Sequence, residues 1–328
     1  MLEMPPFDVH LPSTAEEAFR LRMQLPESMY MAGGTDLLPN LKHHLHTPQH
    51  VIDLTHILEL SGISNSDGGD FRIGGCTTLH DVATHPSIQT ALPGLASAVS
   101  QIAAPQHRKM GTLGGNVMLD TRCVFYNQSQ PWRQALDYCL KKDGTYCHVI
   151  NSPKACVAAQ SSDSVPMLLA LNASIEVLDS DGTRHIDLTE VFGKDGRYDR
   201  VHLFDEHALV VAIHIPRPKE THRSVYRKVR SRNAVDFPQL GLGIAGQFNG
   251  EVCEDLQVAV GAILPQPKRL RGMDFAHGKV LTDEVIQHLA ELAQKQVRPQ
   301  VNIHGSPSWR RHMAKVELKR GLETLRTA

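Results

Sequence analysis

The sequence of 328 residues lacks a long apolar run and lacks a strong net charge of either sign. No segment reaches the roughly 18 consecutive apolar residues that a membrane-crossing helix needs, so no membrane span is expected. The formal net charge is -1 and the pI is near 7.0, so the chain has no basic surface for nucleic acid or for an anionic membrane. With 41% hydrophobic and 21% charged residues it is an ordinary globular chain, and we expect its partners to be proteins or small molecules.

Several catalytic motifs are also missing. No P-loop lysine follows a glycine loop, and the sequence contains no nucleophile elbow and no H-E-x-x-H. These absences argue against an NTPase and against the usual hydrolases. The chain opens without a secretory signal pattern, and we therefore expect a cytoplasmic protein with reduced thiols.

The length exceeds that of a usual single domain, so we expect two or three domains. Residues 13–54 have the pattern of a small β-α-β unit that begins with a capped helix. Short strands and apolar helices follow, up to a strong strand at 209–215. A polar stretch at 217–223 then precedes a separate α+β unit. We place the domains at residues 1–56, 57–220 and 221–328.

Two glycine loops are the first candidates for a binding site. They are Ala32-Gly33-Gly34-Thr35-Asp36-Leu37-Leu38 and Gly111-Thr112-Leu113-Gly114-Gly115-Asn116, and neither is a G-x-G-x-x-G. Paired glycines permit positive φ and let backbone N–H groups approach an anion, and a following helix N-terminus adds a favourable dipole. A large ligand with two phosphates would fit between two such loops, although tight strand corners would explain the same residues.

Four of the six cysteines fall within 34 residues, at positions 123, 139, 147 and 156. Thiolates clustered in this way suit a tetrahedral zinc or an iron–sulfur cluster. The gaps of fifteen, seven and eight residues contain no C-x-x-C, which disfavours a zinc ribbon, and they do not match the compact ferredoxin pattern either. Spacing alone leaves a metal site and scattered buried thiols equally open.

Taken together, the first glycine loop, the Thr112–Asn116 loop and the later Tyr226-Arg227-Lys228-Val229 strand resemble the FAD-binding medium subunit of the xanthine dehydrogenase family of molybdenum hydroxylases. The resemblance runs along nearly the whole chain. It implies an α+β protein, with a two-part FAD-binding domain of the PCMH type, similar to vanillyl-alcohol oxidase. A C-terminal α+β domain of the CO dehydrogenase flavoprotein type would follow.

Most members of that family lack the segment at about 121–160. Its residues Thr121–Ser129 and Tyr138–Lys141 closely resemble the 4-hydroxybenzoyl-CoA reductase subfamily, in which the inserted loop carries one 4Fe-4S cluster. The resemblance implies that the ligands are Cys123, Cys139, Cys147 and Cys156. Cys76 and Cys253 match no ligand and are expected to be buried thiols.

The resemblance also assigns the flavin contacts. The first loop would wrap the pyrophosphate, and the second would meet the phosphate and sugar region. Ile102 falls where xanthine oxidoreductases place an aromatic residue beside the flavin ring, which alters the expected stacking and the access for NAD. The residues implied are Met31, Ala32, Gly33, Gly34, Thr35, Asp36, Leu37, Leu38, Ile102, Thr112, Gly115, Asn116, Asp163, Val210 and Lys228.

The function implied is electron transfer without a catalytic residue of this chain's own. The complex would contain a large molybdopterin subunit and a small subunit with two 2Fe-2S clusters, as a dimer of heterotrimers that removes the hydroxyl of 4-hydroxybenzoyl-CoA with electrons from ferredoxin. Lys141 and Lys142, beside Cys139, would attract ferredoxin if they are exposed. The alternatives are the flavin subunit of an aldehyde or N-heterocycle dehydrogenase, and a zinc-stapled binding module without flavin.

Overall fold

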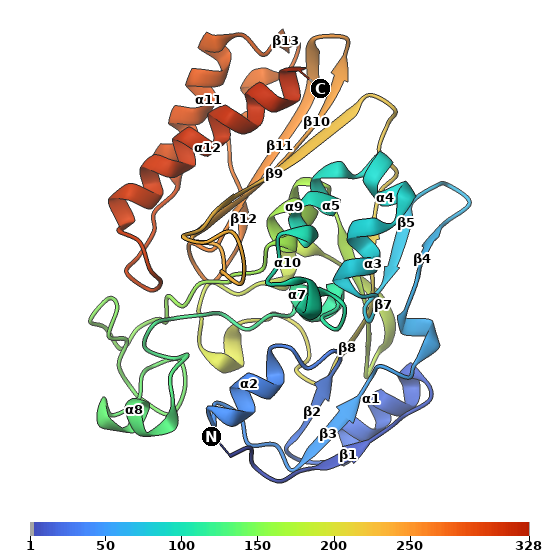
Figure 1. The fold of residues 1–328 in the computed structure, drawn as a ribbon, viewed down its shortest axis with the longest axis vertical. Coiled ribbons are helices and arrows are strands. Elements are labelled where there is room, and N and C mark those ends of the chain that lie inside the picture. Colours follow the sequence, from blue (N-terminus) through green and yellow to red (C-terminus); the bar gives the residue numbers. More distant parts are fainter. Residues whose placement is uncertain (1–2, 328) are drawn as a thin grey trace.

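The computed structural model describes residues 3–327, which form three β-sheets that follow one another along the chain (Figure 1). Helices lie between the sheets and on their outer faces. The expected α+β architecture is confirmed. Within the described residues, no helix combines the length and the apolarity that crossing a membrane would require.

The first sheet is parallel, and its strand order is β1-β3-β2. Helix α1 begins as the sequence predicts, because the Thr14 side chain accepts a hydrogen bond from the Glu17 N–H while the Glu17 carboxylate accepts one from the Ser13 N–H. The elements are β1 (Asp8–His10), α1 (Ala15–Gln24), β2 (Ser28–Met31), α2 (Leu37–Lys42) and β3 (His50–Asp53).

The second sheet is antiparallel, in the order β4-β5-β8-β6-β7. Its strands are β4 (Ile63–Asn65), β5 (Phe71–Gly74), β6 (Ser174–Asp179), β7 (Gly182–Asp187) and β8 (Leu209–Ile215). The helices of this part are α3 (Leu79–Thr84), α4 (Pro86–Ala91), α5 (Pro93–Ser100), α6 (Pro105–Arg108), α7 (Leu113–Val117), α8 (Gln130–Ala135), α9 (Ser164–Ala170) and α10 (Leu188–Val191), with short 3-10 turns at Leu58–Leu60 and Tyr198–Arg200. The helix expected from Gly94 to about Ala104 is shorter than predicted, because α5 ends at Ser100 and Pro105 starts a new turn.

The third sheet has the order β12-β11-β10-β9, and β13 also pairs with β11. Two long helices cover one of its faces (Figure 1). The elements are β9 (His222–Val229), β10 (Leu240–Asn249), β11 (Val252–Gly261), β12 (Lys268–Arg269), a 3-10 turn at Met273–Ala276, β13 (Lys279–Val280), α11 (Asp283–Gln296) and α12 (Pro307–Thr327).

Helix α9 packs between the second and third sheets, so these parts of the chain share one core. A Cβ on Gly243 of β10 would lie 2.3 Å from the Pro166 carbonyl oxygen, which requires glycine at this contact. Gly241, Gly243 and Gly246 happen to match G-x-G-x-x-G, but they lie inside a strand and not at a strand-to-helix turn. These glycines therefore serve packing and are not a dinucleotide site.

The segment at 121–160 has little regular structure apart from α8, and it lies at the edge of the molecule beside the N-terminal sheet (Figure 1). Four of its residues other than glycine have positive φ, namely Asp137, Tyr138, Asp143 and Asn151. Such conformations cost free energy and persist only where surrounding contacts fix them. The shape of this segment must therefore be set by what it binds and what it packs against.

Candidate functional site

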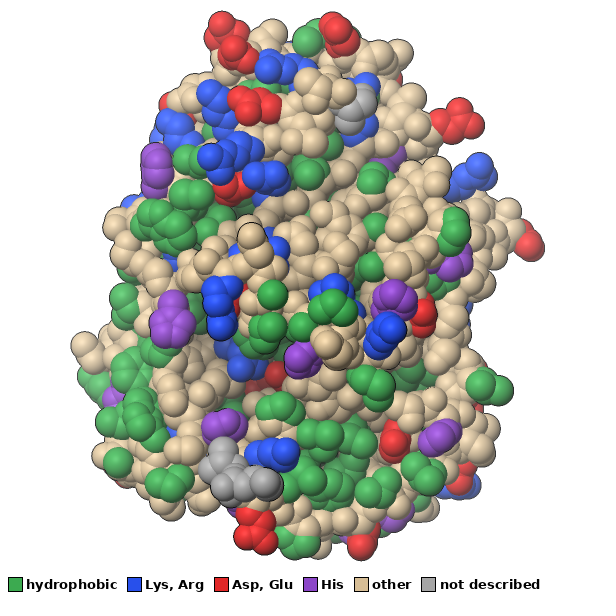
Figure 2. Space-filling model, viewed as in Figure 1, with side chains coloured by type: hydrophobic (Ala, Val, Ile, Leu, Met, Phe, Trp, Pro, Cys, Tyr) green, Lys and Arg blue, Asp and Glu red, His purple; other side chains and the backbone are tan. Residues whose placement is uncertain are grey.

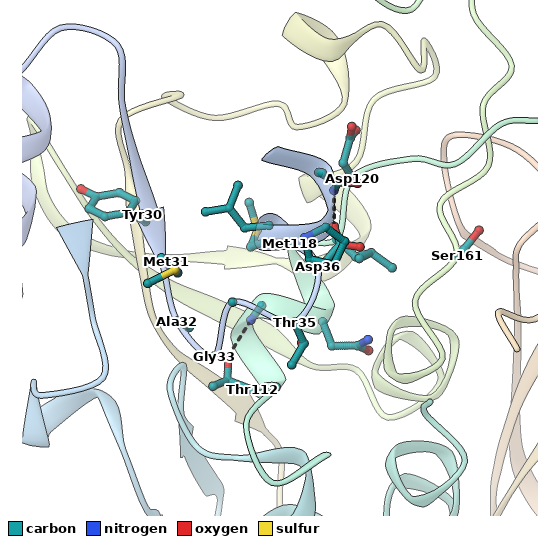
Figure 3. A pocket seen from close by; sticks show the side chains of 18 of the residues that line it. Tyr30, Met31, Ala32, Gly33, Thr35, Asp36, Thr112, Met118, Asp120 and Ser161 are labelled. Atoms are coloured by element: carbon teal, nitrogen blue, oxygen red, sulfur yellow. Dashed lines mark hydrogen bonds between the residues drawn. The ribbon is translucent and has the colours of Figure 1, made fainter. Parts of the chain in front are cut away.

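The two glycine loops line one cavity of about 640 Å³ (Figure 3). This volume is within the range of ligand-binding pockets. Residues of the first loop line it together with Thr112, Met118 and Asp120. The predicted residues on the cavity wall are Met31, Ala32, Gly33, Gly34, Thr35, Asp36, Leu37, Ile102, Thr112, Gly115, Asn116 and Asp163.

The first loop is pressed against the segment that leads into the second. A Cβ on Gly33 would lie 1.7 Å from the Met110 carbonyl oxygen, a distance that no side chain can occupy. Gly34 has φ +66°, which favours glycine. The paired glycines therefore do two different things: one permits a backbone contact between the loops and the other makes the turn.

The second loop opens toward the cavity at Gly115. Thr112 caps helix α7, and its hydroxyl oxygen accepts a hydrogen bond of 3.1 Å from the Gly115 N–H. Gly115 is exposed, and a Cβ there would meet only this hydroxyl, at 3.1 Å. The Asn116 side-chain oxygen accepts hydrogen bonds from the Ser162 and Ser164 hydroxyls, each 2.7 Å long. The chain that returns from the 121–160 segment is thus fixed to the second loop.

Asp163 is at the buried end of this arrangement. Its carboxylate accepts hydrogen bonds from the Tyr226 hydroxyl at 2.7 Å and from the Lys228 ammonium at 2.8 Å, both from β9. Burial raises the pKa of Asp163 and lowers the pKa of Lys228, and the attraction between the two charges opposes both shifts. The pair fixes the third sheet against the cavity.

Three predicted flavin residues, Leu38, Val210 and Lys228, are not on the cavity wall. Leu38 lies beneath the turn, where its side chain would be 3.1 Å from a Cβ on Gly34. Val210 packs against the core of the second sheet. Lys228 reaches the wall only through Asp163. The wall also contains residues that local sequence signals did not mark, because they come from distant segments: Tyr30, His43, His107, Met118, Asp120, Arg122, Tyr198, His202, Phe204 and Phe237.

Buried polar atoms on this wall lack a partner among the described residues. They are His43 Nδ1, Asp120 Oδ2 and His202 Nε2. A buried polar atom without a hydrogen bond is costly, so these atoms indicate a polar ligand or water in the cavity. Burial lowers the pKa of His202 to about 4, so its ring is neutral at pH 7. The cavity thus combines exposed loop backbone with unsatisfied polar groups, which fits a long, polar, phosphate-bearing ligand such as FAD.

The four clustered cysteines are all buried and line a second, smaller cavity. Burial, together with a smaller contribution from the neighbouring cysteines, raises the pKa of Cys123 and of Cys156 to about 12. Thiolates at this site therefore need a bound cation, and metal binding would displace the thiol protons. Cys76 and Cys253 lie in other parts of the core, where burial raises their pKa to about 12 and about 11, as expected of inert thiols.

The distance between the sulfur atoms helps to distinguish a single metal ion from a metal cluster. A tetrahedral zinc with Zn–S bonds of about 2.3 Å holds its sulfurs about 3.8 Å apart. Among the described residues, no three of the four sulfur atoms all lie within 4.8 Å of one another. A four-iron cluster binds each thiolate at a different iron and accepts wider spacing. The four sulfur atoms therefore do not have the mutual spacing of a single tetrahedral zinc site.

Lys141 and Lys142 are not exposed, and the prediction that they attract ferredoxin is wrong. The Lys141 side chain is 1% exposed, and its ammonium donates to Asp120 Oδ1 (2.7 Å), Thr121 Oγ1 (2.7 Å) and the Gly196 carbonyl (3.0 Å). The Lys142 ammonium donates to the Leu45 carbonyl. Both amines therefore fix the segment to neighbouring parts of the chain. Its exposed surface carries Trp132, Leu136 and Tyr146 instead, and apolar side chains gather over this region (Figure 2).

The Asp120–Lys141 ion pair stands between the two cavities, because Asp120 lines the larger and Lys141 the smaller. A second link begins at Arg122, next to Cys123. Its guanidinium donates to Asp36 Oδ1 at 3.0 Å and stacks on Phe237, 3.9 Å from the ring centroid. These contacts hold the cysteine segment against the first glycine loop and against the third sheet's connecting loop.

The comparisons identify the class of protein. A family described as the FAD binding domain in molybdopterin dehydrogenase matches residues 5–218, and the CO dehydrogenase flavoprotein C-terminal domain matches residues 224–325. The chain therefore belongs to the FAD-binding medium subunits of the molybdenum hydroxylase family. This membership contradicts the alternative of a zinc-stapled module without flavin.

Relatives share the whole architecture. The aldehyde oxidoreductase FAD-binding subunit PaoB of Escherichia coli is 31% identical over 280 residues, which are 83% of this chain and 86% of that protein. The carbon monoxide dehydrogenase medium chain of Hydrogenophaga pseudoflava is 27% identical, with 97% and 96% covered. The crystal structure of quinoline 2-oxidoreductase from Pseudomonas putida has the same fold, with a TM-score of 0.78, 23% identity and 99% and 98% coverage.

The two glycine loops should respond differently to substitution. Gly115→Val places a side chain at the cavity wall and should weaken FAD binding about 10-fold or more, or ~1.4 kcal/mol, with little loss of stability. Gly33→Ala should lower the free energy of unfolding by about 3 kcal/mol as well, because its Cβ meets backbone. Flavin titration and thermal unfolding measure both effects. Full flavin retention in Gly115→Val would place the ligand elsewhere.

Lys141→Met should destabilise the protein by about 3 kcal/mol, because it removes the partner of a largely buried carboxylate. The control is Lys154→Met, since Lys154 is an exposed lysine of the same segment and its loss should change stability by less than ~0.5 kcal/mol. Chemical denaturation compares the two variants. Equal stability of both would show that the buried ion pair does not form in solution.

Proposed function

We propose that this chain is the electron-transfer subunit of a molybdenum hydroxylase complex, with FAD in the larger cavity and one 4Fe-4S cluster on Cys123, Cys139, Cys147 and Cys156. The observation that carries the proposal is the placement of the two cavities on either side of the Asp120–Lys141 pair. In this proposal the Asp120–Lys141 pair would lie between the two redox groups.

For FAD, the support comes from the family, the size of the cavity and the two glycine loops. When bound, FAD supplies one- and two-electron redox chemistry. The chain contributes backbone N–H groups, the Thr112 cap and the buried Asp163–Lys228 pair, which bind and orient the ligand. Among the described residues on the cavity wall we see no nucleophile paired with a base, so we assign no catalytic residue.

For the cluster, the support is specific to this chain. The four cysteines come from a segment with little helix or strand, yet all four converge on one buried cavity. Among the described residues no three of their sulfurs lie within 4.8 Å of one another, which disfavours one zinc, and a four-iron cluster binds each thiolate at a different iron. Lys141 adds a fixed positive charge beside them, which would favour the more reduced, more negative state of a bound cluster.

The proposed complex has the partners named above: a large molybdopterin subunit, a small subunit with two 2Fe-2S clusters, and assembly as a dimer of heterotrimers in the cytoplasm. We propose the domain division at residues 56 and 220 on the same basis. The donor or acceptor outside the complex would dock on the segment that carries the cluster. Its exposed Trp132, Leu136 and Tyr146 make that contact largely apolar.

The relatives favour oxidation of an aldehyde or an N-heterocycle as the reaction of the complex. They include, besides the aldehyde oxidoreductase subunit, the nicotinate dehydrogenase FAD-subunit of Eubacterium barkeri and the nicotine 6-hydroxylase medium subunit of Paenarthrobacter nicotinovorans, which are 26% and 24% identical. The second candidate is reductive dehydroxylation of 4-hydroxybenzoyl-CoA with ferredoxin. The observation that favours it is the resemblance of residues 121–129 and 138–141 to that subfamily.

Cys139→Ser tests the two-cofactor assignment. The variant, purified anaerobically with its partner subunits, should lose the 4Fe-4S signal in EPR and the iron of that cluster, while the 2Fe-2S clusters of the small subunit remain and FAD stays bound because the glycine loops are intact. Cys76→Ser is the matched control, since Cys76 is equally buried but lies in another core, and it should keep both cofactors. An intact 4Fe-4S signal in Cys139→Ser would refute the ligand assignment.

The intact complex distinguishes the two reactions. If it is a dehydrogenase, an aldehyde or an N-heterocycle should reduce the flavin under anaerobic conditions. The flavin absorbance should then fall at least as fast as the complex turns over. If it is the reductase, those compounds should leave the oxidised flavin unchanged, and 4-hydroxybenzoyl-CoA should reoxidise flavin that dithionite has reduced. Stopped-flow absorbance measures both directions in one preparation.

A further inference from the structure

A third cluster of side chains lies on the second sheet, away from both cavities. Glu176 of β6, His185 of β7 and His214 of β8 each offer one ligand atom, and these three atoms all lie within 4.8 Å of one another. Among residues 3–327 this is the one group of three or more His, Cys, Asp or Glu side chains with that property. None of the three lines the flavin cavity or the cysteine cavity.

The strand register explains why these residues meet. Glu176 is paired directly with His185 across β6 and β7, and His214 is paired with Ser174, two residues before Glu176. Ile175 and Ile213, which alternate with them, point into the core, so Glu176 and His214 point to the opposite face. Three neighbouring strands therefore present the three side chains at one spot on a rigid surface.

The three side chains contact one another and are partly exposed to solvent. His214 Nε2 lies 2.7 Å from Glu176 Oε2, and the rings of His185 and His214 meet edge to face with their centroids 4.6 Å apart. Glu176 and His214 have side chains that are 15% and 26% exposed, and His185 is exposed. The group is thus held in place on its inner side and open to solvent on its outer side.

Arg72 of β5 is a further charged side chain that interacts with the group. Its Nε lies 3.3 Å from Glu176 Oε2, the same oxygen that His214 approaches. A cation bound by Glu176 would therefore compete with Arg72 for the carboxylate. This competition lowers the affinity of the site for a cation, and removing Arg72 should therefore raise that affinity.

We propose that Glu176, His185 and His214 form a binding site for a divalent transition metal ion, with zinc as the best match. Two imidazoles and one carboxylate are a common zinc ligand set, and a fourth position remains for water. Copper and nickel also suit imidazole ligands, whereas magnesium and calcium prefer oxygen ligands alone.

The metal would cross-link neighbouring strands of the sheet. Strand β7 is at the edge of the sheet and pairs only with β6. A metal held by His185 would connect β7 to β8 across β6, and binding to the folded state alone raises stability. The site is independent of the flavin and of the cysteines, so it stands whether or not the proposed function holds.

Zinc titration by calorimetry tests the proposal, on the full chain purified anaerobically so that the four cysteines already hold their own metal. We expect one Zn²⁺ per chain and at least 10-fold weaker binding in the His185→Ala/His214→Ala variant. The matched control is His10→Ala/His50→Ala. His10 and His50 also lie in contact on adjacent strands beside Asp8, but those three residues do not bring three ligand atoms within 4.8 Å. Equal affinity in the unaltered chain and the His185/His214 variant would overturn the site.

Arg72→Gln provides the second test. If Arg72 competes with the metal, its removal should tighten zinc binding about 10-fold, whereas an affinity that is unchanged or weaker would contradict the competition. Cu²⁺ EPR of the unaltered protein gives a readout that needs no variant to fold. We expect hyperfine splitting from two imidazole nitrogens; a spectrum with none or one would overturn the ligand set.

Discussion

A backbone contact between Gly33 and Met110 holds the two glycine loops together, and the larger cavity depends on it. The first loop follows β2 of the first sheet, and the second leads from α6 into α7, about 80 residues further along the sequence. Because a Cβ at position 33 would overlap the Met110 carbonyl oxygen, only glycine lets the two backbones come this close. The helix α7 that follows is capped by Thr112, so both loops present backbone to the same space. The cavity is in this sense a junction between the part of the chain that forms the first sheet and the part that forms the second.

Cationic side chains of the cysteine segment attach the segment to that junction. Arg133 donates to the His44 carbonyl at 2.8 Å, Lys142 donates to the Leu45 carbonyl, and Lys141 pairs with Asp120. A buried ammonium or guanidinium is costly unless it is paired, so each of these side chains fixes the segment in one position. The same contacts explain why the lysines near Cys139 cannot serve as an exposed docking surface.

Local signals in the sequence were enough to predict the two glycine loops. They were not enough to predict the cavity residues that come from distant segments. Paired glycines predicted both loops, and capping residues predicted the start of α1. The burial of Lys141 could not be predicted, because its partner Asp120 is 21 residues away and nothing local marks the pair. His202 and Phe237 reach the cavity only through tertiary folding, and Val210 and Leu38 turn away from it for the same reason. The spacing of the cysteines likewise left a metal site and scattered thiols equally open until the fold brought all four to one cavity.

The cysteine segment itself shows why a cluster is a reasonable structural element here. Its small core consists of three of the thiols, Leu45, Tyr126 and Ala158, with few other apolar side chains packed against it. So little buried apolar surface cannot offset the ordering of about 40 residues, four of which hold positive φ without being glycine. Metal binding to thiolates contributes directly to folding free energy, and it does so most where no other core exists. A cluster on the four cysteines would therefore supply both an electron-transfer centre and the missing core of the segment, which links the electron-transfer role proposed for this segment to its fold.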